Sequence, residues 1–278
     1  MAIVTFWSGN RKQAGQTLSL LAIATQMAAE HNMRCLIVDA TFDDDTIERA
    51  YWVKGKKTVA QTLNKGKLDI ASGAEGLVSA VASNKTSPEI IANFTKVIFR
   101  DRLDILLGLK TKVIQDHEKS LMLYKDLLLA ANKYYDMVFV DLSKTLARET
   151  TKAILGCSNL IMYTFPQNMA QIQDYIQFLQ TEPLMQKGNV MPVLSNAIDE
   201  SKYNVKNVSK FIGEKGKICY VPNHFPFMEA ACEAGVGKFF LDNRTISNKL
   251  HPNVVFLKTV DESCEKIISK LQEMQLKA

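Results

Sequence analysis

Short apolar runs that alternate with longer helical patterns constrain the fold of this chain more than any other feature. Ala2–Trp7 is typical of a buried strand, Thr17–Glu30 is rich in Leu and Ala like a helix packed on a sheet, and Cys35–Val38 is a second apolar run. A strand–loop–helix–strand series of this length is a βαβ unit, and its strands should be parallel.

The same alternation continues to the end of the chain. Further strands are expected at Leu103–Leu109, Met137–Val140, Leu160–Phe165, Val190–Leu194 and Ile218–Val221. Further helices are expected at Ser120–Asn132, Met169–Gln180, Phe227–Ala234 and Thr259–Gln275. The pattern predicts an α/β fold, with a doubly wound and mostly parallel sheet of about seven strands and helices on both faces. Because the sequence shows no long linker and no internal repeat, we expect one domain over residues 1–278.

Composition and charge place the chain among ordinary globular proteins. Of its 278 residues 47% are hydrophobic, and the net charge of +5 comes from scattered lysines. The tightest basic run is Lys54, Lys56 and Lys57, for which we favour a solvated loop over a contact with nucleic acid or acidic lipid.

The five cysteines are odd in number and lack CxxC spacing, which indicates reduced thiols and suggests no metal site. Without a signal-like start or an apolar run of ~20 residues, the chain is expected to be cytoplasmic.

Polar residues gather where the predicted strands end. They are the loop after Trp7, then Asp39, Asp141, Asn196 and the pair Asn223–His224. In open α/β sheets ligands bind at the carboxyl ends of the strands. This edge of the sheet is therefore the expected binding site.

The loop Ser8–Thr17 has the place and the residue types of a phosphate-binding loop. It reads SGNRKQAGQT, follows the first strand and opens the first helix. Backbone N–H groups at a helix start point at an anion, and glycine lets the backbone approach phosphates closely. A lysine just before the Ser/Thr would neutralise the phosphates, and the hydroxyl would hold Mg²⁺.

These motifs resemble the ParA/MinD superfamily of deviant P-loop ATPases, whose signature is Lys-Gly-Gly-x-Gly-Lys-Thr. Gly15-Gln16-Thr17 is similar to the closing Gly-Lys-Thr, Leu36–Ala40 to the second acidic motif, and Met137–Asp141 to the Walker B strand. The resemblance implies ATP and Mg²⁺ as ligands, with Asp39 and Asp141 as the catalytic residues and Thr17, Asp39 and Asp141 as the metal ligands. The nucleotide-binding positions that it implies are Arg11, Lys12, Gln13, Ala14, Gly15, Gln16, Thr17, Leu18, Asn196 and Pro222.

The loop departs from the signature at the positions that carry its charge and its glycines. Gln16 replaces the phosphate-binding lysine, and Lys12 and Gln13 stand where two glycines belong. Losing a lysine–phosphate contact should cost on the order of 2–4 kcal/mol of binding. Arg11, which aligns with the signature lysine, or Lys12 is the alternative source of positive charge. We therefore expect weakened ATP binding and no efficient hydrolysis.

Two strand ends also depart from the resemblance. Thr41 stands where a further Asp is common in the second acidic motif, and Leu142-Ser143 follows Asp141 without the usual proline. Asp39 and Asp141 are each open to two interpretations, a role toward Mg²⁺ or water and a structural cap. Asp43–Asp45 is interpreted as a solvated turn or helix cap before Thr46–Trp52, with a metal or partner contact as the alternative.

The histidines and the last helix are expected to have structural roles. The four histidines, His31, His117, His224 and His251, show no ligand spacing and are expected to be surface or structural residues. The last helix has an apolar face that includes Val260 and Ile267, and its polar face mixes acidic residues with lysines. Membrane-surface helices favour a clearly basic polar face, so we expect this helix to pack on the core.

Within the superfamily the chain looks most like TadZ/CpaE-type proteins, which implies a role in localising or assembling a Tad-type pilus or secretion machine. The resemblance implies a homodimer, a protein partner in that assembly, and membrane association only through partners. The alternative is a competent, slow ATPase that switches between monomer and nucleotide-bound dimer. A dethiobiotin-synthetase-like ligase is a third class that the fold permits, and a DNA-partitioning role would predict a denser basic patch.

Overall fold

The computed structural model describes residues 1–9, 14–42, 44–53, 74, 76–77, 88–144, 146–183, 188–214 and 216–277. Its strands are β1 (Ala2–Trp7), β2 (Cys35–Ala40), β3 (Lys96–Phe99), β4 (Leu103–Leu106), β5 (Met137–Leu142), β6 (Leu160–Pro166), β7 (Val190–Ala197) and β8 (Cys219–Pro222). They form one eight-stranded sheet in the order β3-β4-β2-β5-β1-β6-β7-β8. Every neighbouring pair is parallel except β3 with β4. The predicted α/β sheet is confirmed, with the antiparallel edge strand β3 as an addition.

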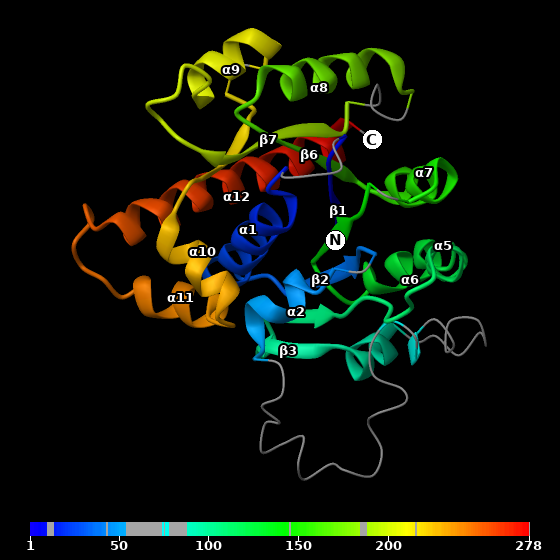
Figure 1. The fold of residues 1–278 in the computed structure, drawn as a ribbon. Coiled ribbons are helices and arrows are strands. Elements are labelled where there is room, and N and C mark those ends of the chain that lie inside the picture. The colour runs from blue at the N-terminus through cyan, green and yellow to red at the C-terminus, as the bar shows by residue number, and fades with distance from the viewer. Residues whose placement is uncertain are drawn as a thin grey trace.

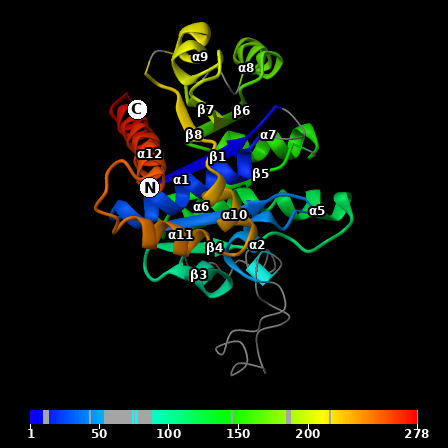
Figure 2. The ribbon, with the colours of Figure 1, turned by 60° about the vertical axis from the view of Figure 1, so that its left-hand side comes forward.

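Helices cover the two faces of the sheet, each over its own apolar core (Figure 1). One core includes α1 (Gln16–Glu30), α2 (Thr46–Tyr51), α10 (Phe225–Cys232), α11 (Val236–Asn243) and α12 (Pro252–Lys277). The other includes η1 (Pro88–Phe94), α5 (Ile114–Leu121), α6 (Tyr124–Ala131), α7 (Arg148–Cys157), α8 (Met169–Thr181) and α9 (Val205–Ile212). Figure 2 shows α11 and α12 to one side of the strands and α5 and α7 to the other.

The central strand β1 shows why its sequence is apolar except for Thr5. Val4 and Phe6 pack into the core that contains α1, whereas Ile3 and Trp7 pack into the opposite core. Successive side chains of a strand point to opposite faces, and a strand covered on both faces must bury all of them. A continuous apolar run is therefore the expected pattern of a central parallel strand.

Helix α12 packs on the sheet as the sequence predicts. Val260, Cys264 and Ile267 are fully buried, and Leu271 is nearly so. The helix lies against α1 and β8, and it begins at Pro252, earlier than the expected Thr259. Among the residues that the structure describes, no helix is long and apolar enough to cross a bilayer.

Several elements differ from the sequence expectation. The helix expected at Ser120–Asn132 is two helices, α5 and α6, which meet at Met122 and Leu123. Helices α7, α9 and α11 were not expected, nor was strand β3. These missed elements are short: β3 has four residues, and α9 and α11 have eight each.

The packing of α12 gives a test of its place in the core. Ile267→Ala should lower the free energy of unfolding by about 2–5 kcal/mol, because it leaves a cavity under the helix. Leu276→Ala on the same helix should change it by less than about 0.5 kcal/mol, because Leu276 is 89% exposed. Urea denaturation followed by circular dichroism measures both. If both substitutions changed the free energy of unfolding equally and by little, α12 would not fold together with the sheet.

Candidate functional site

Ala14 and Gly15, at the end of the phosphate-loop segment, lie against Ser195 near the end of β7. Strand β6 separates β7 from β1, the strand that the loop follows. Gly15 has a φ of 64° and stands at the N-cap of α1. A Cβ atom there would lie 2.7 Å from Cβ of Ser195, so only glycine fits both the backbone angle and the space. The Ser195 hydroxyl donates a hydrogen bond of 2.5 Å to the carbonyl of Ala14. This contact fixes where α1 begins, and Ser195 was not singled out from the sequence.

The first turn of α1 is bonded to the end of β5. Nε2 of Gln16 donates to Oδ1 of Asp141 at 2.5 Å and to the Leu142 carbonyl at 3.0 Å. Oγ1 of Thr17 donates to Oδ2 of the same carboxylate at 2.6 Å. Both oxygens of Asp141, which is fully buried, are thus held by neutral donors. The structure brings together three of the predicted residues, Gln16, Thr17 and Asp141.

Asp39 lies beside Asp141, because the two occupy the same register position on the neighbouring strands β2 and β5. Its Oδ1 accepts hydrogen bonds from the backbone N–H of Thr41 at 3.0 Å and from the Thr41 hydroxyl at 2.6 Å. Gly108, after β4, packs closely here, since an added Cβ would lie 2.9 Å from Oδ2 of Asp39. Thr41, a departure from the resemblance, therefore serves Asp39 as a hydrogen-bond donor.

Burial governs the electrostatics of the two carboxyls. It raises the pKa of Asp39 to about 7, and the negative charges of Asp141 and Asp44 add to this, while the hydrogen bonds from Thr41 oppose it. Burial also raises the pKa of Asp141 to about 6, against the hydrogen bonds from Thr17 and Gln16. Among the residues that the structure describes, no cationic side chain donates a hydrogen bond to either carboxyl. A cation here would stabilise the charged form of both.

Apart from residues 14–17, the predicted nucleotide-binding residues lie at this edge of the sheet, pack in the core, or fall outside the described residues. Asn196 has a φ of 47°, and its Nδ2 would lie 3.4 Å from a Cβ on Gly15, so it borders the loop. Pro222 pairs with Ala197 across β7 and β8, and it therefore shares this edge of the sheet. The Leu18 side chain packs against the core on the α1 face. Arg11, Lys12 and Gln13 lie outside the described residues, as does Asp43.

An aromatic cluster lies under the start of the loop, and sequence reasoning missed it. Trp7, the last residue of β1, makes edge-on ring contacts with Tyr163 and Phe178 at centroid distances of 5.5 Å and 5.0 Å. A Cβ on Gly9 would collide with Oη of Tyr163. Gly9 is thus required by packing as well as by any approach to phosphate. The apolar end of β1 was the one signal for this cluster.

The remaining polar candidates have structural partners. Asp44 caps α2 by accepting hydrogen bonds from the backbone and hydroxyl of Thr46, and Asp45 pairs with Arg49 at 2.6 Å. Asp44 thus satisfies the first backbone N–H of α2, as the turn-or-cap interpretation expects, whereas Asp45, the N-cap residue, makes no side-chain cap hydrogen bond. His224 stacks on Phe256 at 4.6 Å. The other three histidines also have structural contacts: His117 is buried against Phe42, His251 accepts a hydrogen bond from the Asn253 backbone, and His31 pairs with Asp261.

A cavity of about 320 Å³ lies elsewhere in the molecule. Its lining includes Tyr175, Val190 and Lys217, near the start of β7. In a parallel sheet this is the edge opposite to the strand ends that carry Asp39, Asp141 and Asn196. The cavity is thus separate from the candidate site.

Comparison with known proteins agrees with this arrangement at the level of the fold. No protein-family model matches the sequence, and no curated protein matches it significantly. Solved structures do match: a ParA family ATPase from Chlorobium tepidum TLS aligns with a TM-score of 0.66 and 15% identity over 94% of this chain and 97% of that one. A chain of the MinC:MinD cell division protein complex from Aquifex aeolicus aligns with a TM-score of 0.64 and 13% identity over 97% of this chain and 96% of that one. The septum site-determining protein MinD with Mg-ADP from Pyrococcus horikoshii OT3 gives 0.59 and 14% over 97% and 98%. The chain has the fold of ParA/MinD-type P-loop ATPases.

The raised pKa of Asp39 predicts a dependence of stability on pH. Because the folded chain holds the Asp39 proton more tightly than the unfolded chain does, the stability from this group is full below about pH 4 and is lost as the pH rises to about 7. Asp39→Asn should therefore stabilise the protein at pH 8 by about 1–3 kcal/mol and should not stabilise it at pH 4. Thermal and urea denaturation in EDTA measure this.

The control for this prediction is Asp199→Asn, which alters an exposed carboxylate near the same edge of the sheet. Its effect on the free energy of unfolding should be small at both pH values. An Asp39→Asn variant that is equally destabilised at pH 4 and pH 8 would contradict the assignment, since the hydrogen bonds with Thr41 would then outweigh the cost of the buried charge.

Proposed function

We propose that this protein is a ParA/MinD-like localisation or assembly factor whose nucleotide site binds ATP weakly and hydrolyses it poorly. On this proposal residues 1–278 form one domain with a degenerate phosphate loop, most similar to TadZ/CpaE-type proteins. Its partner would be a component of a Tad-type pilus or secretion machine, and it would reach the membrane only through that partner. Nucleic acid is not an expected partner, because the lysines form no dense basic patch in the sequence.

The observation that carries this proposal is the pairing of Gln16 with Asp141. The position that should present a positive charge to the phosphates presents a neutral amide, and that amide is hydrogen-bonded within the protein. A nucleotide that engaged Gln16 would have to displace it from a buried carboxylate, which leaves two acceptors without donors. Binding would then lack both the charge of a lysine and a free donor.

The oxygen donors at the site suit Mg²⁺, whereas Gln16 brings no charge to a triphosphate. The Thr17 hydroxyl and the carboxylates of Asp39 and Asp141 lie together, and hard cations such as Mg²⁺ favour such ligands. In bound Mg²⁺–ATP the nucleotide would supply the phosphoryl group, and the Mg²⁺ ion would supply the positive charge that offsets the two carboxylates. The protein's own contribution would be the backbone N–H groups at the start of α1 and the positioning of Asn196 and Pro222 toward a base.

The two alternative functions are a slow ATPase and a small-molecule ligase. A slow ATPase that cycles between monomer and nucleotide-bound dimer would use the same residues, with Arg11 or Lys12 in place of the lysine. The match to the MinC:MinD cell division protein complex supports protein partners in general. A ligase acting on a small molecule would require a substrate constellation, and the residues around Asp39 and Asp141 described above supply none.

Substitution at Gln16 tests the proposal directly. Gln16→Lys should tighten ATP binding, by about tenfold for each 1.4 kcal/mol of phosphate contact recovered. It should restore little hydrolysis, because Lys12 and Gln13 still occupy glycine positions of the signature. Calorimetric titration with Mg²⁺–ATP, fluorescence of the loop-adjacent Trp7 and phosphate release measure these effects.

Gln16→Met is the matched control, since it keeps the length of the side chain and removes the amide without adding charge. It should destabilise the fold by about 1–3 kcal/mol through the lost hydrogen bonds to Asp141, and it should not tighten ATP binding. Efficient hydrolysis by the unmodified protein would refute the proposal, as would an unchanged ATP affinity in Gln16→Lys.

Self-association gives the second test. A constitutive dimer that pairs across the loop edge should be dimeric at tens of micromolar with and without ATP, as measured by light scattering. Two apolar side chains are exposed near this edge, Ile198 after β7 and Phe225 after β8, with 48% and 66% exposure. Phe225→Glu should therefore shift the protein to monomer.

Phe211→Glu is the control for the dimer test, because Phe211 is 51% exposed at the far end of α9. It should leave the dimer intact. A monomer under both conditions would refute the constitutive dimer, and a dimer that forms only with ATP would favour the switching ATPase.

A further inference from the structure

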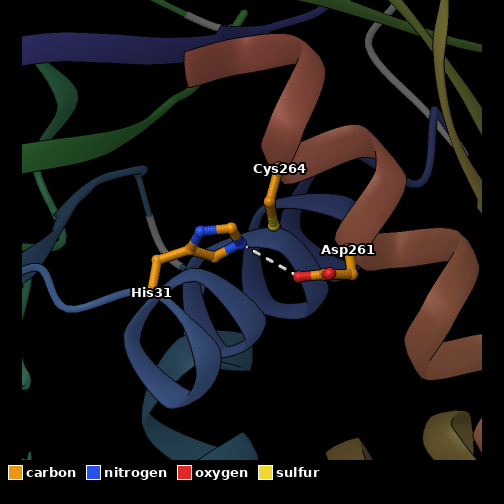
Figure 3. Close-up of side chains that lie close together, drawn as sticks. All are labelled: His31, Asp261 and Cys264. Carbon is orange, nitrogen blue, oxygen red and sulfur yellow. Dashed lines mark hydrogen bonds and ion pairs between the residues drawn. The ribbon is translucent and has the colours of Figure 1, made fainter. Parts of the chain in front are cut away.

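Three possible metal ligands lie together at the end of α1 that is opposite to the phosphate loop (Figure 3). His31 follows the last residue of α1, and Asp261 and Cys264 lie one turn apart on α12. Their ligand atoms are all within 4.8 Å of one another. Nε2 of His31 is 3.0 Å from Oδ1 of Asp261. Sequence spacing does not reveal this cluster, because His31 and Asp261 are 230 residues apart.

We propose that His31, Asp261 and Cys264 bind a divalent cation of the Zn²⁺ class and that this ion ties α12 to α1. An imidazole, a thiolate and a carboxylate are the ligands of zinc sites, whereas Mg²⁺ and Ca²⁺ take oxygen ligands only. Three protein ligands leave one tetrahedral position for water. That position has access to solvent, since the side chains of His31 and Asp261 are 21% and 31% exposed.

The ligands are held in place by the surrounding chain. Asp261 and Cys264 are at positions i and i+3 of one helix, which puts both on the face toward α1. The His31 N–H donates to the Met27 carbonyl at 3.0 Å, and its carbonyl accepts from the Met33 N–H at 2.7 Å. Nε2 of Gln26 donates to Oδ1 of Asp261 at 3.3 Å, and such outer contacts orient metal ligands. Little rearrangement is needed for the three groups to share one ion.

The proton balance of binding is simple. In the structure the Cys264 thiol is fully buried and donates to the Ile23 carbonyl at 3.5 Å. On binding, the ion takes the place of this thiol proton, which passes to solvent. Nε2 of His31 gives up the proton that it donates to Asp261, either to Nδ1 of the same ring by exchange with solvent or, from the charged ring, to solvent, and its lone pair then faces the ion. The Asp261 carboxylate exchanges its contact with His31 for a contact with the same ion. No oxidant or other reactant is required.

The competing interpretation is an ion pair beside a buried thiol that only fills space. A His–Asp pair with this exposure stabilises a fold modestly, and it needs no thiol. The two interpretations differ in what Cys264 contributes. A metal site requires all three residues together, whereas an ion pair is independent of the sulfur.

Cobalt is the probe that separates the two, because Co²⁺ enters zinc sites and a Co²⁺–thiolate bond gives a charge-transfer absorption band. The full chain should bind one equivalent of Co²⁺ with that band in the presence of excess Mg²⁺, which occupies the oxygen ligands Asp39 and Asp141. Zn²⁺ should displace the Co²⁺ and abolish the band. Zinc should also raise the melting temperature.

Two pairs of variants make the test specific. His31→Ala should weaken Zn²⁺ binding at least about 100-fold, whereas His251→Ala should not change it. Cys264→Ser should remove the charge-transfer band, whereas Cys232→Ser, which alters an exposed thiol, should keep it. Asp261→Asn, at a partly exposed position, repeats the test if Cys264→Ser does not fold.

The proposal is overturned by Co²⁺ binding without a thiolate band, by a band that persists in Cys264→Ser, or by unchanged Zn²⁺ affinity in both His31→Ala and Asp261→Asn. Tight binding that is lost in these variants and kept in both controls supports it. None of these outcomes depends on ATP.

Discussion

The structure around the candidate site depends on how the buried carboxylate of Asp141 is satisfied. Burying an unpaired carboxylate is costly, and here the Gln16 amide and the Thr17 hydroxyl occupy both of its oxygens. These bonds join the first turn of α1 to the end of β5, and the contact of Ser195 with Ala14, two residues before the helix, joins the loop to β7. The start of α1 is thus held from both sides without any ligand.

The order of the strands places the start of α1 beside the strand ends that carry the aspartates. Because β1 lies between β5 and β6, and β2 is the next strand beyond β5, the loop after β1 opens beside the ends of both strands that carry aspartates. Asp39 and Asp141 are neighbours in register, so the charge of one disfavours the charge of the other. A divalent cation or a lysine would resolve this conflict. Gln16 supplies hydrogen bonds instead, and burial leaves both carboxyls with raised pKa values.

Much of this arrangement could be predicted from the sequence, because central parallel strands must be apolar throughout and ligand-binding residues must follow them. Ala2–Trp7 and Leu160–Pro166 are close to the expected bounds for this reason. Strand β3 escaped prediction because it is a short edge strand whose side chains are only partly buried. Helix α7 begins with the polar run Arg148–Lys152, so its periodicity is masked. Contacts such as Ser195 with Ala14 and His31 with Asp261 depend on tertiary packing, and no local pattern encodes them.

The geometry also changes how the remaining motif residues should be weighed as evidence for catalysis. In a working loop Thr17 and Asp141 are explained by their bonds to Mg²⁺, but here they bond to each other at 2.6 Å and stabilise the chain on their own. Their presence is therefore expected in a scaffold as well as in an enzyme. Gln16 is different, because a neutral amide at that position bonds to Asp141 and brings no positive charge to a triphosphate. Gln16 is thus the residue on which our proposal of a scaffold rests.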